Sequence, residues 1–247
     1  MDIVEQTVKS GVAPLELVYQ QVISTRSERR EAFRAQLRIN SLELGTLMPM
    51  QYQEISLKNI QSERLAAWVI EKLTEEIDTI DFASIQYDWI SFYAPVRMLY
   101  RNKLYNKLSR LVKNGKIKDS SKIALEFSSD ILYGNKETLR KYLNDIKSLG
   151  FILILNDFGG EYCPITRVYQ MPFDIVILNS YVKHLTKNEK TKKVAQNIIN
   201  YARDLDFRVT MTDVDSESEI SETYENGCSL CIGEVSGDYK KVGEIVV

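Results

Sequence analysis

The order of hydrophobic patterns along this chain predicts an α/β fold, a barrel of parallel strands surrounded by helices. From residue 62 onward, segments with the spacing of amphipathic helices alternate with short apolar or β-branched runs. Two strand-like runs precede them and bring the predicted total to about eight strands, a number that closes most simply into a (β/α) barrel. An open doubly wound sheet is the alternative, because periodicity alone does not distinguish the two.

The first two strands are predicted to pair antiparallel. Residues 15–23 and 30–39 both have strand character, and only the polar turn of residues 24–29 separates them. No crossover helix fits into so short a connection, so the two runs form a hairpin. An irregular stretch containing Gly45 and Pro49 then leads to about residue 61.

The remaining elements follow from residue spacing and from helix-end signals. Leu65, Val69, Leu73 and Ile77 form one apolar stripe, which predicts the first helix. Helices are expected at residues 62–81, 96–114, 136–149 and 188–206, with a shorter one at about 218–226. Strands are expected at residues 86–94, 122–129, 151–157, 174–179, 207–213 and 228–235.

Composition excludes several classes of protein. The 32 basic and 34 acidic residues of the 247 give a net charge of −2, so binding to a nucleic-acid polymer or an anionic membrane is not expected. No apolar run approaches the length of a transmembrane helix, and residues 1–5 lack the order of a signal peptide. These observations predict a cytoplasmic protein.

The cysteines are expected to be core residues. Cys228 and Cys231 form a C-x-x-C pair, a spacing that also occurs in redox and zinc sites. Their segment has strand character, however, and residues three apart on a strand point to opposite faces. A second such pair is missing and His184 is the only histidine, so buried, reduced thiols are the preferred interpretation.

The most informative segment is residues 151–162. An apolar strand follows the helix of residues 136–149, and it ends in Asn156, Asp157 and a glycine turn. The carboxyl end of a strand is where α/β proteins bind ligands. The segment resembles the "DDFGxG" signature of EAL domains, the family of cyclic di-GMP phosphodiesterases. It differs from that signature at Asn156 and at Glu161.

Other segments resemble the same family in the same order along the chain. They are Tyr19-Gln20, Glu31-Ala32-Phe33, Gly45-x-x-x-Pro49-x-x-Tyr52, Leu125-Glu126-Phe127-Ser128, Pro172-x-Asp174, and Gly227-Cys228 with Gly233. The resemblance implies a modified TIM-type (β/α)8 barrel with one antiparallel strand near the N-terminus. It implies a single domain over residues 1–247 with a core of about 15–235, and the predicted front hairpin agrees with this fold.

The resemblance also implies a chemistry, the hydrolysis of cyclic di-GMP by two divalent metal ions. Such an ion pair needs several oxygen ligands whose charge offsets the repulsion between the ions. On this resemblance Glu31 stands at the motif glutamate, Glu126 at the fourth-strand glutamate and Asp157 at the second aspartate. Gln20, Glu31 and Asp157 would contact cyclic di-GMP if it binds.

Many of the family's functional positions are changed in this sequence. Asn156 replaces the first aspartate, Ile177 replaces a lysine that helps to position the attacking water, and Thr212 replaces a glutamate. Tyr93 falls at the metal-binding asparagine and Ile232 at a glutamine. We therefore expect a catalytically degenerate site that holds at most one Mg²⁺ weakly through Glu31, Glu126 and Asp157. The alternative is a phosphodiesterase of low activity that depends on Mg²⁺ or Mn²⁺.

Dinucleotide binding without hydrolysis is the less favoured expectation. The family places an arginine four residues after the motif glutamate, and this position is Ala35 here. Arg34 is adjacent, but successive residues of a strand face opposite sides, so Arg34 is expected to point away from the barrel mouth.

Simpler interpretations of the candidate residues remain open. Glu31 is also explained as a paired or exposed charge, and Asp157 as a turn residue. Glu126 lies between two apolar residues, so it must face a core or a cleft, where an isolated carboxylate is costly. The resulting hypothesis is a stand-alone, non-enzymatic regulator. It acts by binding a protein partner or, less favoured, cyclic di-GMP, and it forms a homodimer as the family resemblance implies.

Overall fold

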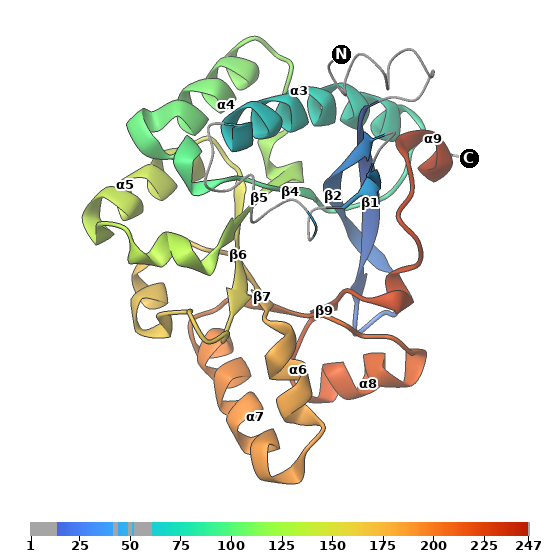
Figure 1. The fold of residues 1–247 in the computed structure, drawn as a ribbon, viewed down its shortest axis with the longest axis vertical. Coiled ribbons are helices and arrows are strands. Elements are labelled where there is room, and N and C mark those ends of the chain that lie inside the picture. The colour runs from blue at the N-terminus through green and yellow to red at the C-terminus, as the bar shows by residue number, and fades with distance from the viewer. Residues whose placement is uncertain (1–13, 42–43, 49–50, 52–60, 247) are drawn as a thin grey trace.

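The computed structural model of the chain describes residues 14–41, 44–48, 51 and 61–246. The strands within these ranges form one sheet, in the order β1-β9-β8-β7-β6-β5-β4-β2-β3 with a further pairing of β1 with β2. That last pairing closes β1, β2 and β4 to β9 into a barrel, with β3 added at its edge (Figure 1). The strands are β1 (Leu15–Ser24), β2 (Arg30–Ser41), β3 (Gly45–Leu47), β4 (Ile90–Tyr93), β5 (Ile123–Ser128), β6 (Ile152–Phe158), β7 (Ile175–Leu178), β8 (Arg208–Met211) and β9 (Leu230–Cys231).

Strand direction confirms the predicted hairpin and the barrel. β1 is antiparallel to both of its barrel neighbours, β2 and β9, whereas every pairing from β2 through β4 to β9 is parallel. The fold is therefore the barrel with one antiparallel strand near its N-terminus, and the open sheet is excluded. We call the end at which the parallel strands finish the mouth.

Helices cover the outside of the barrel, as Figure 1 shows. They are α3 (Gln61–Phe82), α4 (Lys103–Lys113), α5 (Lys136–Lys147), α6 (Ser180–Thr186), α7 (Glu189–Asp204), α8 (Glu217–Glu225) and α9 (Val242–Ile245). None of the helices in the described ranges is long and apolar enough to cross a membrane.

Most element boundaries agree with the sequence, and the differences have local causes. The helix predicted over residues 96–114 begins as α-helix only at Lys103, because Arg101 and Asn102 both adopt left-handed backbone angles. Helix α6 was not predicted; it is short, and the Asn179 side chain caps it by accepting a hydrogen bond from the Tyr181 amide. Pro49 and Tyr52, two positions of the family resemblance, lie outside the described residues.

Two apolar layers hold the barrel together. The inner cluster contains residues of the strands and their flanks but none of the helices, and it includes Ala32, Trp89, Ile154 and Ile177. The outer cluster packs the opposite strand faces against the helices. Along each strand, side chains alternate between these layers. A side chain on the inner face near a strand's carboxyl end therefore projects into the mouth.

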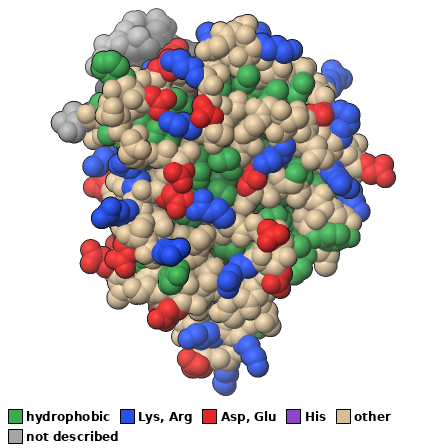
Figure 2. Space-filling model, turned by 180° about the vertical axis from the view of Figure 1, so that it is seen from behind, with side chains coloured by type: hydrophobic (Ala, Val, Ile, Leu, Met, Phe, Trp, Pro, Cys, Tyr) green, Lys and Arg blue, Asp and Glu red, His purple; other side chains and the backbone are tan. Residues whose placement is uncertain are grey.

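The surface and the cysteines agree with the sequence analysis. Basic and acidic side chains are interspersed on the face shown in Figure 2. Cys228 and Cys231 are both buried, as predicted, and both are free thiols. Burial raises the pKa of Cys228 to about 12 and that of Cys231 to about 11, so the reactive thiolate form is disfavoured.

Candidate functional site

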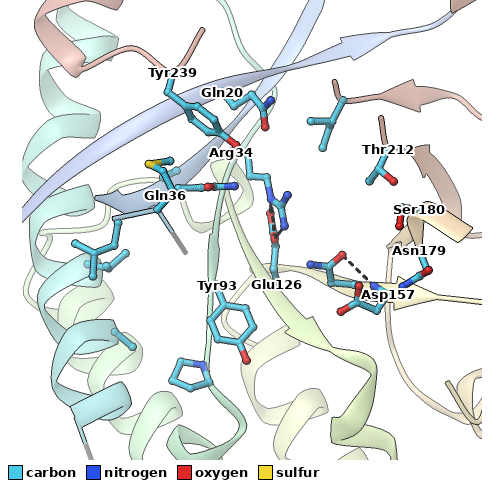
Figure 3. Close-up of a pocket in the computed structure, with 18 of the residues that line it drawn as sticks. Gln20, Arg34, Gln36, Tyr93, Glu126, Asp157, Asn179, Ser180, Thr212 and Tyr239 are labelled. Carbon is cyan, nitrogen blue, oxygen red and sulfur yellow. Dashed lines mark hydrogen bonds and ion pairs between the residues drawn. The ribbon is translucent and has the colours of Figure 1, made fainter. Parts of the chain in front are cut away.

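The mouth of the barrel contains a cavity of about 730 Å³. Most of its polar groups come from the strands and from the segments that follow them, and Figure 3 shows Arg34, Glu126, Asp157 and Asn179 on the side away from α3. Its apolar wall comes largely from α3, with Leu65, Ala66 and Val69. A concave site of this size, with an apolar wall and a few convergent polar groups, is typical of small-molecule sites.

An ion pair between Arg34 of β2 and Glu126 of β5 lies at the centre of the cavity (Figure 3). Arg34 Nη2 lies 2.7 Å from Glu126 Oε2, and Nε donates to both carboxylate oxygens at 2.9 and 3.0 Å. Ser91 Oγ donates a further hydrogen bond of 2.6 Å to Oε1. Glu126 is 1% exposed, and a buried carboxylate is costly unless it is paired. The guanidinium of Arg34 provides the compensating charge.

This geometry corrects the expected direction of Arg34. Ala32 belongs to the inner apolar cluster, and residues 32, 34 and 36 share one face of β2, so Arg34 points into the mouth. Burial is the largest single influence and acts to lower the pKa of Arg34, but the charge and the hydrogen bonds of Glu126, with smaller contributions from Tyr239 and Asp157, together make the net shift upward. Arg34 is thus a fixed positive charge in the cavity.

Glu31 lies at the opposite end of the barrel. The backbone carbonyl of Glu31 accepts a hydrogen bond from the Asp88 amide, before β4 begins, and its side chain pairs with Arg208 at the start of β8. The structure therefore does not bring Glu31 together with Glu126 and Asp157. The paired-charge interpretation describes Glu31 correctly, and Arg34, three residues later on β2, lines the mouth instead.

Asp157 reaches the cavity because the end of β6 is irregular. The pairing register with β7 shifts between Leu155 and Phe158, and Asp157 adopts a left-handed backbone with φ 60°. Its amide donates a 2.9 Å hydrogen bond to Asn156 Oδ1. Burial raises the pKa of the Asp157 carboxyl, although Arg34 and a hydrogen bond from Asn179 act in the opposite direction.

The changed family positions lie where the sequence placed them, around the mouth. Tyr93, Asn156, Thr212 and Ile232 all line the cavity, and so does Gln20. The Tyr93 hydroxyl oxygen is buried and has no hydrogen-bond partner among the described residues. Ile177 lies one layer deeper, in the inner apolar cluster.

The residues present do not fit a pair of divalent ions. Both oxygens of Glu126 already accept hydrogen bonds from Arg34, and the positive guanidinium repels any cation beside them. Glu31 is remote. Within the described ranges, no three His, Cys, Asp or Glu side chains are grouped so that they could hold a metal ion.

The family follows from the match of a family profile described as "EAL domain", which covers residues 4–237. The chain belongs to the EAL family. The cyclic di-GMP phosphodiesterase NbdA of Pseudomonas aeruginosa is 21% identical over 220 residues, which are 89% of this chain and 28% of NbdA. The cyclic di-GMP phosphodiesterase PdeR of Escherichia coli is 22% identical over 210 residues, 85% of this chain and 31% of PdeR. The EAL chain thus spans about a third or less of the length of these two relatives.

Solved EAL structures share the fold. The EAL enzyme Bd1971 with cAMP and cyclic di-GMP superposes with a TM-score of 0.87 at 20% identity, over 98% of this chain and 66% of that one. The EAL domain of FimX from Pseudomonas aeruginosa, bound to cyclic di-GMP, gives a TM-score of 0.80 at 14% identity, over 96% and 95% of the two chains. At these identities the likeness establishes the EAL barrel and not the ligand.

The spacing of the family motif could have identified Arg34 as a residue of the mouth. The family resemblance places an arginine four residues after the motif glutamate, and Arg38 stands four residues after Arg34. The pair Arg34 and Arg38 therefore fits the motif spacing, with an arginine at the position of the glutamate. Arg38 itself does not line the cavity, since it pairs with Glu16 at 2.7 Å.

Proposed function

We propose that this chain is a catalytically inactive EAL domain that regulates by binding a protein partner. The Arg34–Glu126 ion pair is the observation that carries this proposal. It places a side-chain cation at the centre of the mouth, where EAL chemistry would need metal ions, and it occupies both oxygens of the one carboxylate that is fully buried there. Without metal ions, the site lacks the Lewis acid that would activate water and stabilise the developing charge in phosphodiester hydrolysis.

The charge of the cavity also disfavours cyclic di-GMP as the main ligand. This dinucleotide carries two phosphodiester anions, which metal ions or basic side chains must balance. Among the described lining residues, Arg34 is the one Lys or Arg side chain, and Glu126 already neutralises it. Asp157 and Asp213 add negative charge. Binding of cyclic di-GMP without turnover is therefore the second candidate function.

Exposed aromatic side chains near the mouth support a protein partner. Five exposed tyrosines follow four consecutive parallel strands, β4 to β7, in the segments that leave the mouth; they are Tyr100, Tyr133, Tyr162, Tyr169 and Tyr181. Tyrosine is enriched at protein interfaces because it buries apolar area and keeps a polar tip. These exposed segments are also available to a second copy of the chain, so the proposed partner includes a homodimer.

The decisive experiment combines turnover and binding. Purified protein is incubated with cyclic di-GMP and Mg²⁺ or Mn²⁺, the products are separated, and a parallel calorimetric titration measures binding. We expect no linear dinucleotide and no saturable binding, because Arg34, the one cation among the described lining residues, is already neutralised by Glu126. Metal-dependent turnover that is lost in Glu126→Ala would establish the low-activity enzyme instead, and saturable binding without turnover would establish the receptor.

A further inference from the structure

The ionisable groups of the described cavity lining leave an unbalanced negative charge. Four of the described lining residues are Arg, Asp or Glu, namely Arg34, Glu126, Asp157 and Asp213. Arg34 gives three hydrogen bonds to Glu126, so these two form a neutral pair. Neither Asp157 nor Asp213 forms an ion pair with a described residue. Arg34 lies near enough to lower the pKa of Asp157 but forms its ion pair with Glu126, so the polar side of the described cavity keeps carboxylate acceptors without an ion-pair contact of their own.

Asp157 is the better placed of these two carboxylates. It lies on the bulged end of β6, half-buried, and the Asn179 side chain supports it with one hydrogen bond. Asp213 is exposed at the end of β8, where water screens its charge. A partly desolvated carboxylate gains more from a cationic partner than an exposed one does, because the effective dielectric constant around it is lower.

The rest of the cavity suits the apolar part of a ligand. Leu65, Ala66 and Val69 present one side of α3 to the cavity, and Ile232 adds a further apolar side chain where the family resemblance has a glutamine. The buried Tyr93 hydroxyl lies in the same lining and lacks a partner among the described residues. A ligand with an apolar body and a polar hydrogen-bonding group would satisfy both features, because a tyrosine hydroxyl can donate or accept.

From these contacts we propose that the cavity binds a small organic cation of the amidinium, guanidinium or ammonium class, with its positive group at Asp157 and its apolar part against α3. The proposal rests on the proposed function, since it takes the mouth to be free of metal ions. It differs from the family's ligand in the sign of the charge, because an anionic ligand would meet Asp157 with only a neutralised Arg34 beside it.

A matched series of three probes tests the sign of the charge. Benzamidine, benzamide and benzoate share one ring and carry a positive, zero and negative charge. Each is titrated into the intact protein by calorimetry at neutral pH and physiological salt. Benzamidine is expected to bind about tenfold or more tightly than benzamide, which is the effect of one charge-assisted pair, and benzoate is expected not to bind.

Two variants locate the interaction. Asp157→Asn keeps the shape of the side chain and removes its charge, so benzamidine binding is expected to fall to the level of benzamide. Glu161→Gln removes an exposed charge from the next loop residues, outside the cavity lining, and is expected to leave benzamidine binding unchanged. Thermal unfolding of both variants, followed by circular dichroism, checks that each is folded.

Several results would overturn the proposal. Equal binding of benzamidine and benzamide, tighter binding of benzoate, or full binding of benzamidine to Asp157→Asn would each contradict it. Failure of benzamidine to bind wild-type protein at millimolar concentration would do the same. None of these results bears on turnover of cyclic di-GMP, so the proposed function and this inference are tested separately.

Discussion

Arg34 and Glu126 face each other across β4, and each depends on the other. Glu126 is almost completely buried, while the Arg34 side chain is 19% exposed at the mouth. Replacement of a buried pair by apolar residues is often tolerated, but removal of one partner leaves an uncompensated charge and is strongly destabilising. The pair is therefore a structural feature of the mouth as well as an electrostatic one.

Arg34→Met tests this dependence. The substitution keeps an apolar side chain of similar length but leaves Glu126 buried without its cation, so we expect a loss of about 3 kcal/mol in the free energy of unfolding. Urea denaturation followed by circular dichroism measures it. The double variant Arg34→Met, Glu126→Gln removes both charges and should recover much of the loss. A double variant no more stable than the single one would show that the two side chains are not coupled.

Glu16 provides a pH-dependent contribution near the N-terminus of β1. Burial acts to raise its pKa, but hydrogen bonds from Lys241, Arg38 and Asn40 lower it from 4.5 to about 2. Because the folded state binds a proton less readily than the unfolded state, the contribution is fully present above pH 4.5. It is lost as the pH falls toward about 2.

Glu16→Gln should accordingly cost about 1 kcal/mol at neutral pH, a value reduced by solvent screening of the partly exposed pairs. The difference from wild type should shrink as the pH is lowered from 5 to 2.5 in urea titrations. Glu225→Gln is the control, since Glu225 is exposed and forms no ion pair with a described residue. A Glu16 effect that does not change with pH would contradict the assignment.

At the scale of residues, the sequence predicted most positions around the mouth, but it placed Glu31 there and turned Arg34 away from it. Four of these positions lie at or near the end of a strand, where a turn or a change from apolar to polar residues marks that end in the sequence. They are Tyr93, Asn156, Asp157 and Thr212, and all four line the cavity. Strand β2 has no such mark, and its twelve residues allow several registers for a short motif. A shift of three residues along β2 moves a side chain from one end of the barrel toward the other and from one face of the strand to the opposite face.

The long helix α3 and the short strand β9 both shape the mouth. Helix α3 runs for 22 residues and supplies the apolar wall, and the hydrogen bond of 2.7 Å from Tyr19 on β1 to its residue Glu76 fixes it to the barrel. β9 has only two residues, and the chain turns back at Gly233 immediately after it. A Cβ atom at Gly233 would lie 2.1 Å from the carbonyl oxygen of Val214.

Gly233→Ala should therefore destabilise the protein by about 2–3 kcal/mol, because backbone and not a flexible side chain fills the space. Thermal or urea unfolding measures the change. Gly243→Ala is the matched control, since a Cβ atom there meets nothing within 4 Å and alanine favours the helix α9. Equal stability of the two variants would show that the close contact at Gly233 is relieved by a small backbone movement.

Helices of several turns were predictable from their periodicity, and helices of one or two turns were not. The stripe of α3 and the capped helix α5 extend over several turns, so their periodicity identified them within a few residues. Helices α6 and α9 have seven and four residues, too few to show a period. The first part of the predicted 96–114 helix failed for another reason, since a left-handed pair at Arg101 and Asn102 interrupts the pattern without any glycine to signal it.

The whole molecule depends on β1 for closure. This strand pairs with β2 over most of its length and with β9 through two residues, and its backbone also pairs with Lys240 near the C-terminus. Segments from both ends of the described chain thus meet at one strand. Such long-range closure is typical of a single cooperative unit rather than of two independent halves.

We predict one cooperative unfolding transition for the chain. Far-UV circular dichroism reports the helices, and tryptophan fluorescence reports Trp68 on α3 and Trp89 beside β4. In urea, the two signals should follow the same curve with the same midpoint. Separate midpoints would mean that the α3 region and the barrel unfold independently, and that residues 1–247 are not one domain.

A guanidinium at the mouth differs from a bound ion in one further respect. It is joined to β2 by covalent bonds, so chelators cannot extract it and low magnesium cannot empty its place. The positive charge beside Glu126 is therefore supplied by the chain itself and does not depend on the supply of divalent ions. A molecule that binds at this end of the barrel would therefore meet the same positive group at low and at high magnesium concentration.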